Sequence, residues 1–200
     1  MVTRLAPLVA LLLALACAPQ ERASVIVQQP KTATDRFWAL VENARDGGDR
    51  CGRVAGRLTD TLLKLPPTAI EEFGHELSAL MAESYRWDLW AVAYVANGGA
   101  SDDGFDYFRG WLITRGRAQF ERALRDPPAA VIGAKRIISF LPFECEEMLS
   151  VADQAYEKVT RAPLPQATRV AWPKAPLGEA WTEETIDQVY PGLTARVQRQ

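Results

Sequence analysis

The sequence is poor in the residues that most often build catalytic and metal sites. It has one histidine, His75, and three cysteines among 200 residues. A site made of several histidines is therefore excluded, and the cysteines are too few for the disulfide framework of a small secreted scaffold. No CxxC or HExxH motif and no glycine-rich phosphate loop is present, so these signatures support no redox, zinc-protease or nucleotide-binding class.

Basic residues are not in excess either. Lysine and arginine together number 23, against 25 aspartates and glutamates. Because no basic patch stands out, nucleic acid is a poor candidate partner. No serine has a credible triad partner in the sequence, and we predict no catalytic residue, no metal ligand and no cofactor.

The sequence also lacks an apolar run long enough to span a membrane. Residues 5–16 form an apolar run of about a dozen residues, whereas a spanning helix needs about 20. A positive residue precedes the run and small residues end it, which is typical of a secretory signal. Cys17 follows at once, so residues 1–17 resemble a bacterial lipoprotein signal whose cysteine is lipidated. We therefore predict an exported protein anchored to the cell membrane through Cys17, in the periplasm or at the cell surface; the alternative is cleavage after Ala16 and a secreted protein.

The rest of the chain divides into a tether and one domain. Residues 18–33 are polar, contain proline and show no helical period, so we predict a flexible tether. Residues 34–200 are sufficient for one domain with a proper core. They hold no convincing pair of alternating apolar and polar segments, which argues against a β-rich fold. Apolar residues instead recur every three or four positions, which predicts an all-α, single-domain bundle of about six to eight helices.

Three apolar stripes define the first helices. Thr34 is predicted to cap the first helix, and Pro66-Pro67 to separate the second from the third. The stripes are Phe37, Leu40, Val41 and Ala44 in the first helix; Cys51, Val54, Leu58, Leu62 and Leu65 in the second; and Ile70, Phe73, Leu77, Leu80 and Met81 in the third.

Residues 87–96 are apolar on every side except at Asp88, so we expect a buried central helix. The glycine pair at 98–99 ends it, and Ser101 caps a following helix that Gly116 bends or ends. The inward residues of this following helix are expected to be Phe105, Phe108, Trp111 and Leu112, with Phe120 and Leu124 continuing the stripe.

The last part of the chain is less regular. Residues 129–141 allow a short helix or a loop, and residues 161–176 are proline-rich and predicted to form an extended strap. Thr182 can cap a short helix, and Pro191 divides it from a terminal one. Between these, a helix after Pro142 is expected to turn one stripe inward: Cys145, Met148, Leu149, Ala152, Ala155 and Val159.

Three segments carry a resemblance to a bacterial family, domain of unknown function 4240. They are RFWALVENAR at 36–45, the run from YRWDLW to FERAL at 85–124, and ECEEMLSVADQAYEKVT at 144–160. The similarity is strongest over residues 34–160. It implies an α-helical domain and no particular reaction. Ala100 stands where members often carry cysteine, and the export signal also departs from the family pattern.

Nine residues near the central helix form the predicted binding groove, for a protein or small-molecule ligand that the sequence does not identify. They combine aromatic rings with arginines, which can hold a carboxylate or phosphate, and with carboxylates. They are Arg86, Trp87, Asp88, Trp90, Asp102, Asp103, Asp106, Arg109 and Arg115. Packing explains the same residues: Asp88 is expected to bind backbone groups at the glycine pair, or Arg109 or Arg115.

The acidic residues of this set allow a second interpretation. Asp102 and Asp106 lie four positions apart on one helix face, and clustered carboxylates can bind a divalent cation or divide acid and base roles. The simpler explanation is that Asp102 and Asp103 interact with the helix dipole and that Asp106 pairs with Arg109.

Cys51 and Cys145 both fall on apolar stripes. We interpret them as small core residues, with a disulfide between them as the less favoured alternative. The glutamates on either side of Cys145 oppose a nucleophilic thiolate. The sequence therefore favours a binding or interaction module over an enzyme; the alternative is a hydrolase or other enzyme that uses Asp102, Asp103 or Asp106.

Overall fold

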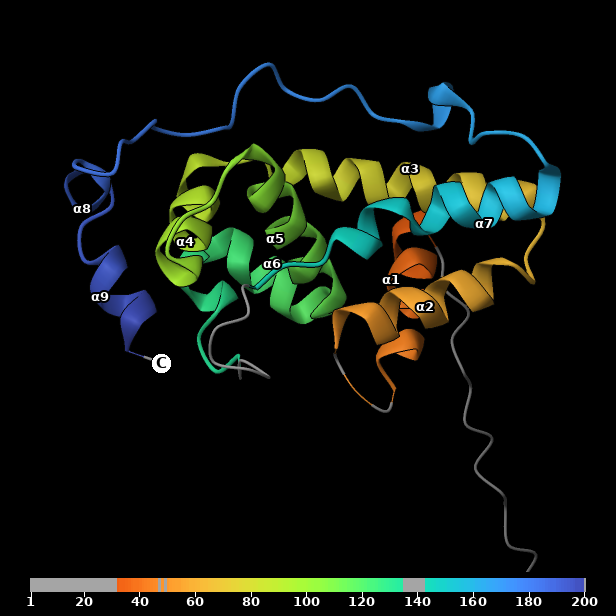
Figure 1. The fold of residues 1–200 in the computed structure, drawn as a ribbon, viewed down its shortest axis with the longest axis horizontal. Coiled ribbons are helices and arrows are strands. Elements are labelled where there is room, and N and C mark those ends of the chain that lie inside the picture. Colours follow the sequence, from red (N-terminus) through yellow and green to blue (C-terminus); the bar gives the residue numbers. More distant parts are fainter. Residues whose placement is uncertain (1–31, 47, 49, 135–142, 200) are drawn as a thin grey trace, which may run out of the picture.

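The computed structural model describes residues 32–46, 48, 50–134 and 143–199 (Figure 1). The signal-like segment 1–17, most of the tether and residues 135–141 of the ambiguous stretch lie outside these ranges. The described chain is helical and has no β-strand, which confirms the all-α prediction. None of its helices combines the length and the apolar character needed to cross a membrane.

The described residues form nine α-helices and three short 3₁₀ turns. The nine helices are α1 (Ala33–Arg45), α2 (Cys51–Leu62), α3 (Pro67–Glu83), α4 (Trp87–Asn97), α5 (Asp102–Thr114), α6 (Arg117–Arg125), α7 (Val151–Thr160), α8 (Ile186–Val189) and α9 (Leu193–Gln198). The 3₁₀ turns are η1 (Pro127–Ala130), η2 (Glu146–Ser150) and η3 (Gln166–Thr168). Helix α3 packs beside α7, and α2 packs against both α1 and α7 (Figure 1).

The N-cap of the first helix lies two residues earlier than predicted. Thr32, not Thr34, is the N-cap: its hydroxyl accepts from the Asp35 N–H at 3.0 Å, and the Asp35 carboxylate accepts from the Thr32 N–H at 3.3 Å. This capping box satisfies two free backbone donors at once. Thr34 is free to donate to the carboxylate of Glu76, 2.8 Å away on α3, and so joins two helices instead of starting one.

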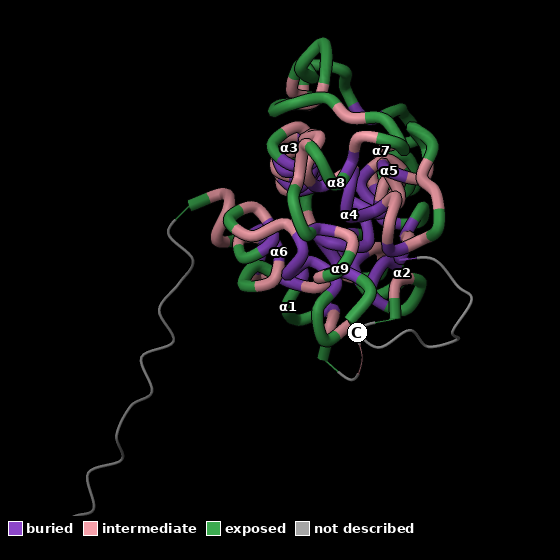
Figure 2. Tube along the Cα trace, turned by 90° about the vertical axis from the view of Figure 1, so that its left-hand side faces the viewer, coloured by how far each residue is buried: buried purple, intermediate pink, exposed green. Residues whose placement is uncertain are grey.

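The predicted central helix is confirmed as α4. Four of its apolar side chains have no exposed surface, and no residue of the helix is classed as exposed (Figure 2). Gly98 ends the helix with φ at 75°, a left-handed conformation that costs glycine little. The buried side chains are Leu89, Ala91, Val92 and Ala93.

Gly116 ends α5 instead of bending it. Its φ is 89°, and α6 begins at the next residue, so the single long stripe of the sequence becomes two helices. This separation explains why nine helices are seen where about six to eight were expected. Ser101 caps α5 as predicted, accepting from the Gly104 N–H at 3.2 Å, and the four residues expected to face inward are buried.

The helix expected after Pro142 starts later than predicted. The chain first makes the 3₁₀ turn η2, and only from Val151 does it continue as α7. Contact with α5 is the reason: the Cys145 N–H donates to the Tyr107 carbonyl at 2.8 Å, and a Cβ on Gly110 would lie only 2.6 Å from the Cys145 carbonyl. Ala152 and Ala155 of α7 are buried as expected, whereas Val159, next to the last residue of the helix and also expected to be buried, is 38% exposed.

The predicted strap is present and is tied down along its length. Residues 161–185, here called the strap, run over α3 from α7 to α8 (Figure 1). The Val170 N–H donates to the Ser78 hydroxyl at 2.9 Å. Further on, Leu177 exchanges two backbone hydrogen bonds of 2.9 Å with the segment between α3 and α4. The strap is therefore part of the fold, held by hydrogen bonds at Val170 and Leu177.

Candidate functional site

Arg86 and Asp88 form an ion pair at the start of α4. Arg86 Nε donates to Asp88 Oδ1 at 3.0 Å, and a second bond joins the other guanidinium nitrogen to Oδ2. Arg86 Nη1 also donates to the Leu124 carbonyl at 3.0 Å, which links α4 to α6. The hydrogen bonds that Arg86 donates to the Asp88 carboxylate raise the pKa of Arg86 above its ordinary value. The expected partners of Asp88 were wrong, because a neighbour two residues away already supplies a bidentate partner.

Two of the tryptophans in this region donate their ring N–H to the backbone. Trp90 Nε1 donates to the Ala100 carbonyl at 3.0 Å, and Trp181 Nε1, from the strap, donates to the Trp87 carbonyl at 2.8 Å. The partly buried rings of Trp87 and Trp90 stack with centroids 5.2 Å apart and planes 10° from parallel. The Trp181 ring packs edge-on against that of Trp87, with centroids 6.1 Å apart.

Arg109 is the most deeply enclosed charge in the described part of the chain. It has no exposed surface, and its guanidinium lies 5.0 Å from the ring centroid of Tyr85, 4.8 Å from that of Phe105 and 4.6 Å from that of Trp172. One nitrogen donates to the Met81 carbonyl and another to Asp106. Burial lowers the pKa of Arg109, and the Asp106 charge opposes this effect. We call Tyr85, Phe105 and Trp172 the aromatic cage.

The three aspartates are not brought together. Asp102 and Asp103 are exposed in the first turn of α5, whereas Asp106 is half-buried and bound to Arg109. Among the residues that the structure describes, these carboxylates do not form a group whose oxygens lie within reach of one metal ion. Arg115, at the end of α5, places its guanidinium 5.7 Å from the Trp111 ring centroid. The nine predicted residues thus take part in several separate contacts. Ligand binding by them stays a prediction.

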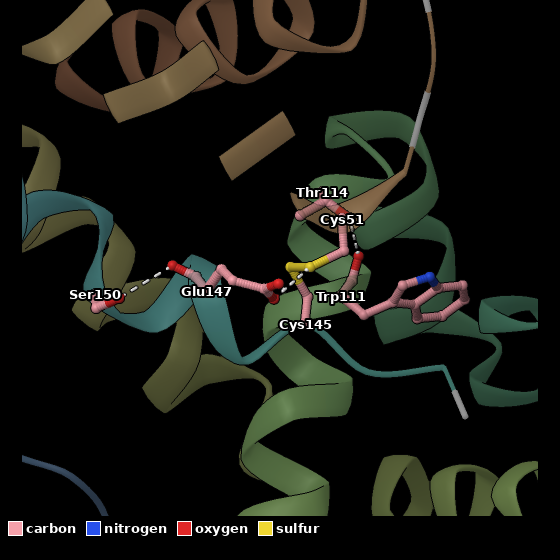
Figure 3. The surroundings of a disulfide bond; sticks show 6 residues. All are labelled: Cys51, Trp111, Thr114, Cys145, Glu147 and Ser150. Atoms are coloured by element: carbon pink, nitrogen blue, oxygen red, sulfur yellow. Dashed lines mark hydrogen bonds between the residues drawn. A yellow bond between two sulfur atoms is a disulfide. The ribbon is translucent and has the colours of Figure 1, made fainter. Parts of the chain in front are cut away.

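Cys51 and Cys145 form a disulfide, which corrects our preference for two separate core residues (Figure 3). Their Cα atoms lie 5.4 Å apart, across a sequence separation of 94 residues. The bond joins the first residue of α2 to the residue before η2. Cys145 is buried and Cys51 is partly exposed. Glu147 Oε2 lies 2.9 Å from Cys51 Sγ, so a carboxylate stands directly beside the bond.

Another hollow in the described residues lies elsewhere, between α1 and α3. It is an open groove of about 550 Å³ with mainly apolar walls. Phe37 and Phe73 form its floor, stacked with centroids 4.6 Å apart, and the Arg36–Glu72 ion pair stands at its edge at 2.7 Å. We call it the α1/α3 groove; its walls are Ala33, Arg36, Phe37, Ala39, Leu40, Asn43, Leu65, Thr68, Ala69, Glu72 and Phe73.

This groove could not be predicted from the sequence, because its residues are ordinary. Leu40 lies on the predicted stripe of α1 but is only partly buried; Leu65, predicted on the stripe of the second helix, lies beyond the end of α2 and is also partly buried. A stripe shows that a side chain faces inward, and it does not show whether the two helices close over that side chain. The available signal was weak: both residues lie at the edges of their stripes.

A smaller cavity of about 200 Å³ lies under the strap. Met81, Asp106 and Trp172 form part of its wall, so it borders the Arg109 contacts. Its charged walls are matched internally, because Asp153 pairs with Arg169 at 2.6 Å and Asp106 pairs with Arg109. This cavity therefore offers a ligand little unmatched charge.

Comparison with known proteins gives a family and no activity. The sequence model of the family described as "Protein of unknown function (DUF4240)" matches residues 33–158. No curated protein and no solved structure matches the chain.

Proposed function

Because the chain belongs to the DUF4240 family, whose activity is unknown, we propose from its own geometry that it is a binding module for an apolar ligand. The α1/α3 groove carries this proposal. Its volume of about 550 Å³ is within the range of pockets that hold small molecules, about 300–1,000 Å³. Apolar walls with a few polar groups at one edge are the common composition of such sites.

The groove supports one ligand chemistry better than others. The two stacked phenylalanine rings of its floor are almost fully buried, so the apolar contact area comes from partly buried walls such as Leu40, Leu65 and Ala69. The polar groups at its edge, Arg36 and Glu72, are already paired with each other in a bidentate contact at 2.7 Å. A ligand therefore gains most by burying a hydrocarbon chain or an aromatic ring, with any charged end left towards Arg36.

We also propose that the domain is exported and held at the membrane by a lipid on Cys17. The lipoprotein-like signal is the main support. The Cys51–Cys145 disulfide supports the same compartment, because disulfides persist outside the reducing cytosol. The helical domain begins at Thr32, so Cys17 would be joined to the groove by a short segment. Mass spectrometry of the mature N-terminus tests this part: a diacylglycerol-modified Cys17 is expected, and a mature N-terminal Cys17 with an unmodified thiol would contradict it.

The binding experiment compares two alanine-to-tryptophan variants. Ala69 lines the groove on α3, and Ala118 is an exposed alanine on α6. A titration of straight-chain fatty acids, followed by displacement of a fluorescent apolar dye, is expected to show saturable binding to the native chain and to Ala118→Trp. Ala69→Trp fills the groove with its own ring and is expected to lose at least about tenfold in affinity, a change of about 1.4 kcal/mol. Equal binding by Ala69→Trp, or no saturable binding by the native chain, would refute the proposal.

A further inference from the structure

The Cys51–Cys145 bond has a third potential metal ligand beside it. Among the described residues, Cys51, Cys145 and Glu147 form the one group of three metal-ligating side chains, with all three donor atoms within 4.8 Å of one another. Figure 3 shows the Glu147 carboxylate turned towards the two sulfurs, although Glu147 is itself exposed to solvent. We propose that reduction of this disulfide creates a zinc site from the two thiolates and the Glu147 carboxylate.

Glu147 Oε2 lies 2.9 Å from Cys51 Sγ, so the carboxylate already stands beside the sulfur that reduction would free. On a tetrahedral zinc a thiolate sulfur and a carboxylate oxygen lie about 3.6 Å apart, so the two atoms need to separate by only about 0.7 Å. Zn²⁺ binds thiolate sulfur at about 2.3 Å and carboxylate oxygen at about 2.0–2.2 Å.

The backbone around Cys145 holds one ligand in place. The Cys145 N–H donates to the Tyr107 carbonyl at 2.8 Å, and Gly110 allows the Cys145 carbonyl to approach α5. The Cys51–Cys145 Cα separation of 5.4 Å also brings the two side chains together without the covalent bond. Two sulfurs on a tetrahedral zinc lie about 3.8 Å apart, so the side chains need only turn away from each other.

The second sulfur lies at the surface. Cys51 is the first residue of α2 and is partly exposed, and Glu147 is exposed. This provides an entry path for the ion and leaves the fourth position to water.

A small dithiol can reduce the Cys51–Cys145 disulfide. The dithiol transfers two electrons and two protons to the disulfide, which becomes two thiols, while the reductant closes its own disulfide. Binding of Zn²⁺ then releases both thiol protons to solvent. The same pair of segments, α2 and η2, is thereby joined by a covalent bond in an oxidising compartment and by a metal in a reducing one.

The test measures zinc affinity in both redox states, on the full chain with Cys17→Ser so that Cys51 and Cys145 are the remaining cysteines. The reduced protein is titrated with Zn²⁺ against a chromophoric chelator. One equivalent is expected to bind, while the oxidised protein binds none at the same concentration. Zn²⁺ is also expected to raise the melting temperature of the reduced protein, because it binds the folded state, and Mg²⁺ is not.

Two variants decide whether the cluster is responsible. Cys145→Ser is expected to abolish stoichiometric binding, and Glu147→Gln to weaken it by at least about tenfold. Glu146→Gln is the matched control, because it removes an exposed carboxylate one residue away in the same turn. Binding that survives Cys145→Ser, or that falls equally in Glu146→Gln and Glu147→Gln, would overturn the proposal. So would reduced protein that stays folded by circular dichroism and binds no zinc.

Discussion

The region around α4 and α5 and the region between α1 and α3 use their side chains in opposite ways. Around α4 and α5 the aromatic rings and arginines bind one another, as in the aromatic cage around Arg109. Between α1 and α3 a groove of about 550 Å³ stays open above two phenylalanines. The residues that stand out in the sequence thus bind one another within the fold. The open groove is lined by residue types that are common in any helix.

The largest effect is expected from Asp106→Ala, which tests whether the α4/α5 region is structural. The variant leaves the Arg109 guanidinium buried without its carboxylate, and an unpaired buried charge costs about 3 kcal/mol or more. Chemical denaturation should show this loss of unfolding free energy. A loss below about 1 kcal/mol would mean that Asp106 is not needed by the fold and is available to a ligand.

Trp172→Ala is expected to have a smaller effect, of about 1 kcal/mol. Trp172 is 42% exposed, yet its ring lies over the Arg109 guanidinium, and such a cation–π contact contributes about 0.5–2 kcal/mol. Leu177→Ala is the matched control on the strap, since Leu177 is 68% exposed and its side chain covers no charge. If both variants lower the melting temperature equally, the contact of Trp172 with Arg109 does not stabilise the fold.

Glu144→Gln should stabilise the protein at neutral pH. Burial raises the pKa of Glu144 above its ordinary value of 4.5, so the folded state disfavours the charged form. The contribution of this group to stability is present below pH 4.5 and is lost as pH rises through its folded pKa. A gain of about 0.5 kcal/mol at pH 7 that disappears in acid is expected. Equal stability of the two proteins across this pH range would contradict the assigned cause.

The smallest effect, with the opposite sign, is expected from Glu72→Gln at the edge of the groove. The hydrogen bond from Arg36 lowers the pKa of Glu72 below its ordinary value of 4.5. Its stabilisation is present above pH 4.5 and is lost as pH falls through the folded pKa. Because both side chains are well exposed, the loss at pH 7 is about 0.3 kcal/mol. Urea titrations at pH 7 and pH 3 measure it; a loss as large at pH 3 would exclude the ion pair as its cause.

Much of the helical order followed from local patterns. The stripes of α2 and α3, the stop at Gly98 and the cap at Ser101 are all present, because periodicity, glycine and capping act within a few residues. The errors arose where distant segments intervened. Cys145 is held by α5, so the chain makes η2 before α7.

The candidate site was harder to predict for the same reason. A sequence shows that Trp87, Asp106 and Arg109 are unusual, and it does not show which partners will satisfy them. The pairing of Asp88 with Arg86 is local, yet the pattern favoured more distant partners. The groove depends on how far apart α1 and α3 pack, a quantity that no single helix encodes.

By itself, the sequence determined the fold class, the buried central helix and the extended strap, since each follows from short-range periodicity or from proline. It also determined the family, through the resemblance that the match over residues 33–158 confirms. Tertiary structure alone decided that Cys51 and Cys145 meet across 94 residues, that Arg109 is enclosed by rings from three segments, and that α1 and α3 leave a groove. These contacts depend on the packing of whole helices. Burial of apolar surface stabilises many possible helix arrangements, and the detailed fit of all side chains in the assembled chain selects one of them.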